Sequence, residues 1–553
     1  MSFEQETADA PSAGRREWIG LAVLTIACVL YAMDLTVLHL AVPSLSADLE
    51  PSSAQLLWIV DIYGFMVASC LITMGTLGDR IGRRRLLMIG AAAFAVVSVL
   101  AAFSTNAEML IASRALQGIA GATLAPSTLS LIFSMFHDPR ERSVAIGVWI
   151  AGFSAGGAIG PVLGGVLLEH FWWGSVFLLA VPVMALLLLL GPRLLPEYRD
   201  PEAGRLDIAS AALSLVAILA IIFGLKEIAQ NGLGGLPISS VVVGIVVSVV
   251  FARRQRSLAD PMIDLSLFRI RSFNASLATN VLGIFIAIGY FLFVAQYLQL
   301  VLDLSPLRAG LWSLPSAAGF IVGSTLAPRI LRRFRPASVI GAGLAMGAVG
   351  LAMLARVDGS ADLSILVAAS VIISLGLAPV FTATTDLIVG SAPPERAGAA
   401  SGISETGAEL GGALGIAVLG SIGTAVYRAE LADRLPRGVP GEATASARDT
   451  LGAAIGAAQQ LPERLGEALV ASAREAFIQG MRVSSTIAAV VAIGVAALAV
   501  VMLRQVPSGS EREATAAADG AAQPRDTTPA TESVELGPDE APSLLVSADN
   551  DER

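Results

Sequence analysis

The chain contains 553 residues, of which 55% are hydrophobic and 15% are charged. A soluble domain of this size needs far fewer apolar side chains to fill its core, so the composition indicates a membrane protein. The formal net charge of −9 does not indicate an acidic binding surface, because eleven acidic residues and three arginines follow Pro507. We therefore expect a nearly neutral membrane body and a disordered acidic tail at 507–553.

Apolar stretches long enough to cross a bilayer recur along the chain. A transmembrane helix needs about 20 mostly apolar residues, and about fourteen stretches meet this criterion. In chain order they cover 18–42, 54–77, 86–104, 107–133, 143–168, 172–192, 208–225, 236–252, 275–300, 309–331, 337–355, 363–390, 398–427 and 483–503. The first stretch is too long for the apolar core of a signal peptide and contains Asp34, so we expect it to be retained. The sequence therefore predicts an all-α membrane protein.

Arginine is concentrated on one side of the predicted spans. It lies before the first span and after spans 2, 4, 6, 8, 10, 12 and 14. Because basic residues near span ends stay cytoplasmic, we expect both termini inside the cell, including the segment 1–17. The Ala-rich segment 428–480 is then extracellular. It forms short amphipathic helices that cap the exit path or lie on the membrane surface, or it is an ordinary long loop.

The sequence contains none of the usual signs of an enzyme or an ATP-driven pump. The single lysine, Lys226, lies in Gly-Leu-Lys-Glu and not in a glycine-rich phosphate loop. Cys28 and Cys70 both fall inside predicted spans and the three histidines are scattered, so we expect no disulfide, metal site or cofactor. Uphill transport by such a protein would need an ion gradient.

Ionisable residues inside the spans are the candidates for ion coupling, because each costs at least about 2.5 kcal/mol to place in a membrane. They are Asp34, Asp61, Arg114, Asp386, Glu405 and Glu409. Counted at about 1.5 Å per residue, Asp34, Asp61 and Arg114 fall in the outer half of the bilayer. Asp34 can therefore pair with Arg114 if the first and fourth spans are neighbours.

The remaining three acidic residues, Asp386, Glu405 and Glu409, form a second set in the inner half and near the middle of the bilayer. Glu405 and Glu409 share one helix face. Like-charged carboxylates in one cavity favour protonation of one group or binding of a cation. The alternative for all six ionisable residues is a structural network with polar backbone or helix ends.

The segment Gly75-Thr-Leu-Gly-Asp-Arg-Ile-Gly-Arg-Arg-Arg85 resembles the signature loop of the major facilitator superfamily. Its motif positions are Gly75, Gly78, Asp79, Arg80, Gly82 and Arg83. Glycines allow a tight turn and close helix approach, and Asp79 can meet a helix end or an arginine. The resemblance implies a conformational latch for the outward-facing state.

Further segments resemble motifs of the drug:proton antiporters in that superfamily. Met33 to Pro43 resembles the first-span motif of fourteen-span members, and Ser113 to Gly118 resembles a motif whose arginine is associated with proton transfer. The fifth span resembles the antiporter motif through Gly152, Gly156, Gly160, Pro161, Gly164 and Gly165. Small residues on one face also suit a generic packing stripe.

A finer resemblance, to efflux pumps for quaternary ammonium compounds and dyes, comes from Trp58 to Tyr63 and from Asp386 to Gly412. It associates Asp61, Glu405 and Glu409 with cation recognition. Trp58 and Tyr63 can stack on an aromatic cation, although most aromatic residues in spans pack or face lipid. The second half of the chain has only a degraded latch, from Gly323 to Arg335, without the acidic residue.

These resemblances imply a major facilitator fold, with six-helix bundles at 18–192 and 273–503 and two extra central helices at 208–252. The implied function is proton-coupled export of lipophilic, often cationic, drugs, dyes or biocides across the cytoplasmic membrane. The expected partners are these substrates, protons and lipids, without nucleic acid, and a monomer is expected. A dedicated exporter of one metabolite or antibiotic would share the motifs. A non-transporting sensor or scaffold would not need charged residues in its spans.

Overall fold

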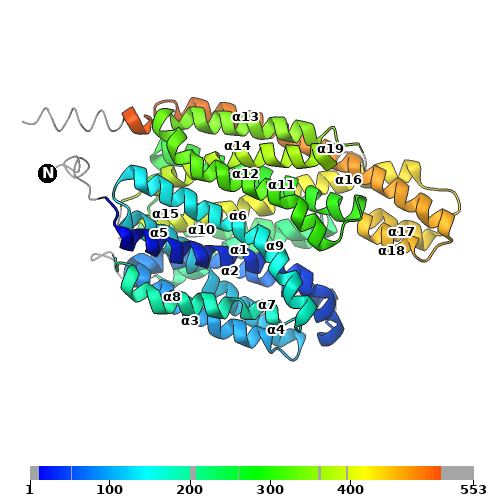
Figure 1. The fold of residues 1–553 in the computed structure, drawn as a ribbon, viewed down its shortest axis with the longest axis horizontal. Coiled ribbons are helices and arrows are strands. Elements are labelled where there is room, and N and C mark those ends of the chain that lie inside the picture. Colours follow the sequence, from blue (N-terminus) through cyan, green and yellow to red (C-terminus); the bar gives the residue numbers. More distant parts are fainter. Residues whose placement is uncertain are drawn as a thin grey trace, which may run out of the picture.

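The computed structural model describes residues 12–51, 53–199, 207–258, 261–358, 363–393 and 396–511 (Figure 1). Their secondary structure is helical throughout, without a strand. The α-helices are α1 Arg15–Leu49, α2 Ser53–Ile81, α3 Arg83–Ala102, α4 Ala107–Gly121, α5 Leu124–Met135, α6 Pro139–His170, α7 Ser175–Leu178, α8 Ala180–Leu194, α9 Ile208–Asn231, α10 Gly235–Ser257, α11 Arg271–Gln296, α12 Pro306–Arg333, α13 Pro336–Leu354, α14 Leu363–Val389, α15 Ala397–Gly415, α16 Ser421–Arg434, α17 Gly441–Asp449, α18 Leu451–Ala458 and α19 Glu463–Leu503. A 3₁₀ turn, η1, covers Leu267–Arg269, and π-helical turns cover Tyr297–Val301 (η2) and Ile416–Gly420 (η5).

The helices supply 14 membrane-spanning segments within the described residues, which confirms the number predicted from hydrophobic length. Four spans are composite, and these are α4 with α5, α7 with α8, α11 with η2, and α15 with η5 and α16. Local capping fixes several helix starts, because side-chain oxygens satisfy free N–H groups in the first turn. Asn106 caps α4, Asp138 caps α6 and Ser305 caps α12.

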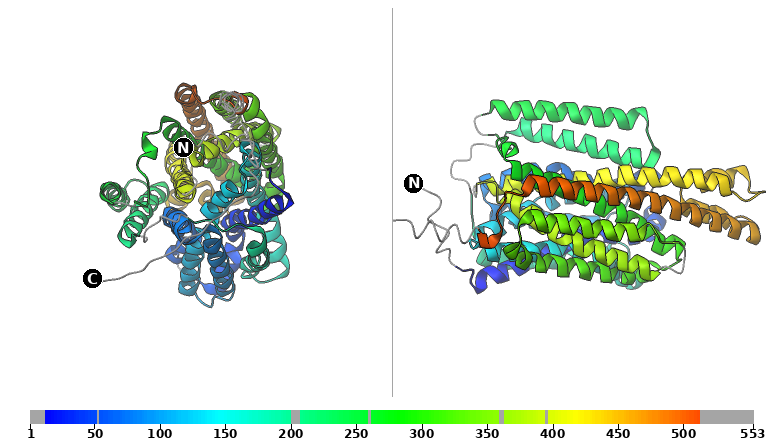
Figure 2. Two further views of the ribbon diagram at one scale, coloured as in Figure 1. Left: turned by 90° about the vertical axis from the view of Figure 1, so that its left-hand side faces the viewer. Right: turned by 90° about the horizontal axis from the view of Figure 1, so that it is seen from above.

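The spans form two bundles, α1 to α8 and α11 to α19, and the view along the helices in Figure 2 shows them stacked side by side. The pair α9 and α10 connects the bundles in the chain and lies at their edge in space (Figure 2). Helix α9 packs against α10, α2 and α15, so it contacts both bundles. Arg254 of α10 donates two hydrogen bonds to Asp207, the N-cap of α9, at 2.7 and 3.0 Å. Hydrogen bonds from Arg254 and Ser210 hold the pKa of Asp207 well below its usual range.

A helical hairpin extends from the end of the second bundle that lies away from the start of α1 (Figure 1). It comprises α16, α17, α18 and the first part of α19, whereas the sequence predicted only short helices or a loop at 428–480. Leu431, Leu451 and Leu469 are buried there and belong to the main hydrophobic core of the protein. The Tyr427 hydroxyl donates a 2.6 Å hydrogen bond to the carbonyl of Ala447.

Glycines allow α6 to approach α1 closely. A Cβ on Gly152 would lie 2.8 Å from the Thr25 side chain, and a Cβ on Gly156 would collide with the carbonyl oxygen of Val29. Gly160 and Gly164 are buried on the same helix, while a Cβ on Gly165 would meet nothing within 4 Å. The side chain of Pro161 lies outside the described residues. The stripe therefore brings two helices of the first bundle together.

The two bundles meet on the face that carries the arginine-rich loops. There α2 packs against α15 and α6 packs against α12. A Cβ on Gly147 would lie 2.6 Å from the carbonyl oxygen of Ser324, and one on Gly402 would lie 2.9 Å from that of Leu71. A Cβ on Gly75 would collide with the Gly398 carbonyl. The backbones of the two bundles are in close contact at each of these three glycines, so the seam has no room for a larger side chain there.

Asp79 connects α2 to the first turn of α15 across this seam. Its carboxylate accepts hydrogen bonds from the backbone N–H groups of Gly398, at 3.1 Å, and Ala399, at 2.9 Å. Arg83 donates to the same carboxylate at 3.0 Å and to the Ser130 carbonyl at 3.2 Å. A negative charge at a helix N-terminus satisfies free N–H groups and stabilises the helix dipole. The geometry is that of a clasp between the bundles.

Other positions of the predicted latch shape this clasp. Gly82 has a φ of +111°, and a Cβ there would lie 2.6 Å from a carboxylate oxygen of Glu197. Both facts favour glycine. A Cβ on Gly78 would make ordinary contact with Leu86, and Arg80 lies in the last turn of α2.

We expect Gly156→Ala to destabilise the folded protein by about 1–3 kcal/mol, because the methyl group displaces the backbone of α1. The measurement is thermal unfolding of the detergent-purified protein. Gly157→Ala is the matched control, because a Cβ at that neighbouring position meets nothing within 4 Å. Equal melting temperatures for the two variants would contradict the packing role of Gly156.

We expect Asp79→Asn to open the seam, because it removes a charge that contributes about 0.3–2 kcal/mol at a helix N-terminus. Spin labels on cysteines replacing the exposed Arg85 and Arg333 would report the separation of the bundles. Cys28 and Cys70 would first be replaced by alanine. The expected result is a population with longer distances in double electron–electron resonance.

The control for this experiment is Asp207→Asn, which also changes an acidic residue at a helix N-terminus but connects only α9 and α10. Its distance distribution should match that of the wild type. A shift in both variants, or in neither, would exclude a specific role for Asp79 in closing the seam.

Candidate functional site

A buried polar cluster in the first bundle connects α1, α3 and α4. The Arg114 guanidinium donates a 2.7 Å hydrogen bond to Asp34 and a 2.9 Å bond to the side-chain oxygen of Gln117. The Gln117 amide donates to Asp34 at 3.4 Å and to the Ser98 hydroxyl at 3.0 Å. The side chains of Arg114 and Asp34 are 2% and 10% exposed, so this ion pair is almost withdrawn from solvent.

Aromatic rings cover the Arg114 guanidinium. It lies 4.4 Å from the ring centroid of Tyr63 and 5.7 Å from that of Phe177. A cation over an aromatic face is stabilised by the ring quadrupole, and more so away from water. The Nε atom of Arg114 and the Tyr63 hydroxyl are both buried without a hydrogen-bond partner in the described structure. The cluster therefore retains unused hydrogen-bonding capacity beside its charges.

Two tyrosines connect this cluster to the acidic residues of the second bundle. The rings of Tyr63 and Tyr31 lie 6.4 Å apart. The Tyr31 hydroxyl lies close enough to Glu409 and Glu405 to interact with both carboxyl groups. Both glutamates are half-buried on α15, four residues apart. The charged groups of the two bundles thus face one another through a layer of phenol rings.

Asp61, the second acidic candidate of the first half, pairs with a residue of the inserted helices. The Lys226 ammonium on α9 donates a 2.6 Å hydrogen bond to the Asp61 carboxylate on α2. The same ammonium lies 4.8 Å from the ring centroid of Phe65. Trp58 stacks on Phe223, with ring centroids 6.3 Å apart and planes inclined by 10°. Asp61 and Trp58 thus belong to one charged and aromatic group at the α2–α9 contact.

Asp386 has a different partner from the two glutamates. The Arg142 guanidinium at the start of α6 lies 3.6 Å from the Asp386 carboxylate near the end of α14. Arg142 also lies 4.9 Å from the ring centroid of Phe133. This ion pair joins the two bundles on the arginine-rich face, beside the α6–α12 contact.

Several residues of these clusters were not among the candidates from sequence, and they include Lys226, Gln117 and Arg142. Lys226 lies one residue beyond the predicted span 208–225, but α9 continues to Asn231 and includes Lys226 in its membrane-spanning segment. Gln117 lies within the motif that identified Arg114. The sequence could have indicated Lys226 and Gln117, because a charged or amide side chain in an apolar helix costs free energy unless it has a polar partner.

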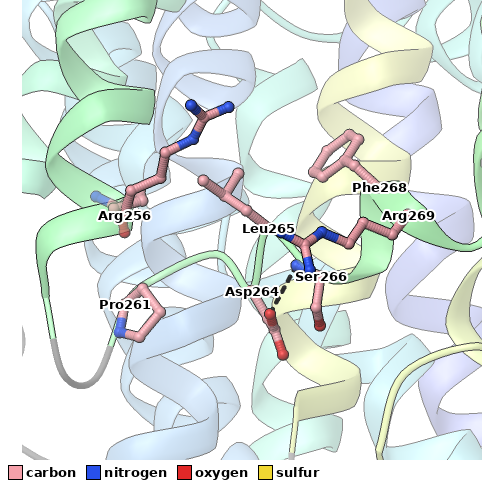
Figure 3. A pocket seen from close by; sticks show the side chains of 8 residues that line it. Arg256, Pro261, Asp264, Leu265, Ser266, Phe268 and Arg269 are labelled. Atoms are coloured by element: carbon pink, nitrogen blue, oxygen red, sulfur yellow. Dashed lines mark hydrogen bonds between the residues drawn. The ribbon is translucent and has the colours of Figure 1, made fainter.

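A separate surface pocket of about 640 Å³ lies on the arginine-rich face, between the end of α10 and the start of α11 (Figure 3). Asp264 in its wall accepts a 2.8 Å hydrogen bond from the backbone N–H of Ser266. Arg256, Phe268 and Arg269 also line it. The pocket is not part of the transmembrane clusters. Among the described residues, no group of histidines, cysteines and carboxylates is arranged to hold a metal ion.

Comparison with known proteins places the chain in a recognised family. The family model described as Major Facilitator Superfamily matches residues 24–416. The chain is 44% identical over 490 residues to the multidrug efflux pump LfrA of Mycolicibacterium smegmatis, covering 89% of this chain and 97% of that protein. It is 36% identical over 464 residues to the methyl viologen resistance protein SmvA of Salmonella typhimurium, covering 84% and 93%.

A solved structure supports the same fold. The crystal structure of the human organic anion transporter MFSD10 (TETRAN) aligns with a TM-score of 0.57 at 16% identity, covering 86% of this chain and 99% of that one. At this identity the likeness concerns the fold alone. The family model, the relatives and the fold agree, and the chain is a multi-pass membrane protein that belongs to the major facilitator superfamily.

Proposed function

We propose that this protein is a multidrug efflux pump of the cytoplasmic membrane that exchanges external protons for lipophilic, mostly cationic, compounds. The observation that carries the proposal is the pairing of two charged sites across the bundles. The Asp34–Arg114 ion pair lies on one side of Tyr63 and Tyr31, and Glu405 and Glu409 lie on the other. The names of LfrA, a multidrug efflux pump, and SmvA, a methyl viologen resistance protein, support this assignment. Methyl viologen is an organic dication.

The proton site in this proposal is Asp34. Protonation neutralises its carboxylate and removes the counter-charge of Arg114, whose guanidinium is nearly inaccessible to water. An unpaired buried charge is strongly unfavourable, so the cluster must rearrange or draw in another anion. Tyr63 and Tyr31 lie on the path from Arg114 to Glu409. Proton binding at one bundle thereby changes the electrostatics of the cation site on the other.

The substrate site in this proposal includes Glu405 and Glu409. Two carboxylates one helical turn apart repel each other, and a bound organic cation relieves that repulsion. Tyr31 beside them offers an aromatic face to the same cation. Proton entry then opposes cation retention, so uptake of a proton from outside promotes release of the substrate outward.

The arrangement of the bundles fits an outward-facing state. We place the arginine-rich face in the cytoplasm, because basic residues near span ends remain inside. Two contacts that join the bundles, the Asp79 clasp and the Arg142–Asp386 ion pair, are on this side. Opening them would expose the sites to the cytoplasm, as rocking-bundle exchange requires.

A dedicated exporter of one metabolite or antibiotic would use the same coupling, and only the range of bound compounds separates the two. A binding panel of ethidium, a quaternary ammonium biocide and a neutral antibiotic distinguishes them. Binding of several unrelated cations supports the multidrug pump. Binding of none would remove the substrate part of the proposal.

We expect Asp34→Asn to abolish proton-driven ethidium efflux, because the amide cannot take up a proton in the working pH range. The measurement is efflux from proteoliposomes with an imposed proton gradient, alongside ethidium binding to the purified protein without a gradient. Binding should persist. The control is Asp48→Asn on the same helix, which retains an oxygen acceptor for the 2.7 Å hydrogen bond from the Trp173 indole. Wild-type efflux by Asp34→Asn would exclude Asp34 as the coupling residue.

We expect Glu405→Gln and Glu409→Gln each to weaken ethidium binding by about tenfold, or about 1.4 kcal/mol, because each removes a negative charge from the cation site. Affinity for a neutral compound that binds the wild type should change much less. Equilibrium binding to purified protein measures both. Glu169→Gln, at an exposed position of α6, is the control. Equal losses for charged and neutral compounds would indicate a structural role for the glutamates.

A further inference from the structure

The Asp61–Lys226 ion pair has the chemistry of a complete organic-cation site that the protein itself fills. The ammonium of Lys226 touches a carboxylate at 2.6 Å and lies 4.8 Å from the ring centroid of Phe65. Trp58 and Phe223 lie beside that ring, with Phe65 edge-on to both at 6.0 and 6.5 Å between centroids. A carboxylate with aromatic faces around it is the arrangement that recognises ammonium and aromatic cations.

A second negative group lies near the same ammonium. Lys226 is within electrostatic reach of Glu409 on α15, as well as paired with Asp61 on α2. This is possible because α9 packs against both α2 and α15. One flexible side chain from the inserted helices therefore offsets negative charge on both bundles.

The pair is also accessible to a small molecule. The side chains of Lys226 and Asp61 are 27% and 18% exposed, unlike the nearly buried Asp34–Arg114 pair. A Cβ on Gly64, three residues after Asp61 on the same helix, would meet nothing within 4 Å. Trp58 is 40% exposed at the edge of the aromatic group. A compound can thus approach the carboxylate from the side that Gly64 leaves open.

We propose that Lys226 is a tethered competitor of the exported cation and thereby sets the affinity of the pump for organic cations. A lipophilic cation takes the place of the ammonium beside Asp61 and Phe65, and the lysine side chain moves away. The affinity of a ligand falls in proportion to the fraction of protein whose site is already filled. This keeps binding weak enough for release and favours cations that gain more from the aromatic rings than an ammonium does.

This inference rests on the proposed function, because it concerns the same substrates. Its rival is a purely structural ion pair that attaches α9 to α2. In that case removal of Lys226 would leave Asp61 without its partner and loosen the helix, and cation affinity would fall or stay constant. If Lys226 competes with the exported cation, removal of Lys226 must instead raise the affinity for cations.

The first test is equilibrium dialysis of tetraphenylphosphonium against purified wild type, Lys226→Met, Asp61→Asn and the double variant. Lys226→Met should bind about fivefold more tightly, within the range of coupling between contacting residues. That gain should vanish in the Asp61→Asn background. Affinity for neutral triphenylphosphine oxide should be the same with and without Lys226. Arg253→Met, at an exposed arginine of α10, is the matched control for loss of a basic residue from the inserted helices.

The second test uses the wild-type chain, so it does not depend on the folding of a variant. Lys226 is the single lysine of the chain, so an amine-reactive reagent labels it alone apart from the N-terminal amine. The 2.6 Å contact with the Asp61 carboxylate shields the Lys226 nitrogen from the reagent. Tetraphenylphosphonium should therefore accelerate labelling of Lys226, measured by mass spectrometry of the peptide that contains it.

The results separate this inference from the function on which it rests. Unchanged or weaker cation affinity in Lys226→Met, an equal gain in the Asp61→Asn background, or labelling that cations do not accelerate would overturn the competitor role. Wild type that binds and exports cations would still support the pump. Wild type that neither binds nor exports tetraphenylphosphonium or ethidium would overturn the proposed function itself.

Discussion

The buried guanidinium of Arg114 is the constraint around which the first bundle is arranged. A charge this far from water is tolerated only with a counter-charge and filled hydrogen-bonding positions. Asp34 supplies the charge, Gln117 supplies an amide oxygen, and Tyr63 supplies a ring face. Asp34 and Arg114 lie on different helices, so α1 and α4 must keep a fixed register. The glycine contacts of α6 with α1 hold one of those helices in place.

In the second bundle the corresponding charged groups are acidic. Its α15 carries two glutamates near the phenol layer, and its N-terminus accepts the Asp79 clasp at the arginine-rich face. One helix therefore takes part both in the seam and in the acidic site. A movement that releases Asp79 must also move Glu405 and Glu409 relative to Tyr31. The Asp79 clasp and the two glutamates are therefore mechanically joined through α15.

Hydrophobic length predicted the fourteen spans because each one needs a long apolar run, and such runs dominate this sequence. Depth along the helices also predicted the Asp34–Arg114 pair, since both residues fall at one level and an unpaired charge there is costly. The roles of these residues remain predictions.

Partners that depend on which helices are neighbours were not predictable in the same way. Asp61 could be assigned a depth but not a partner, because the contact of α9 with α2 is not encoded in either helix alone. Lys226 was missed since the apolar run ends at Leu225, although the helix continues through it. Asp386 was grouped with the glutamates by depth, and its ion pair with Arg142 depends on the seam between bundles. The hairpin was underestimated because α16 and α19 remain helical beyond the apolar stretches that revealed them.

That hairpin gives the second bundle a lever arm. Helix α19 has 41 residues and, at about 1.5 Å per residue, is about 60 Å long, twice the thickness of the hydrocarbon core. It runs without interruption from the membrane into the hairpin, where Leu431, Leu451 and Leu469 pack it against its neighbours. A rotation of the bundle by a few degrees is therefore carried to the tip as a much larger sweep. A molecule bound to the tip would therefore resist such a rotation at the far end of α19, the longest helix of the described residues.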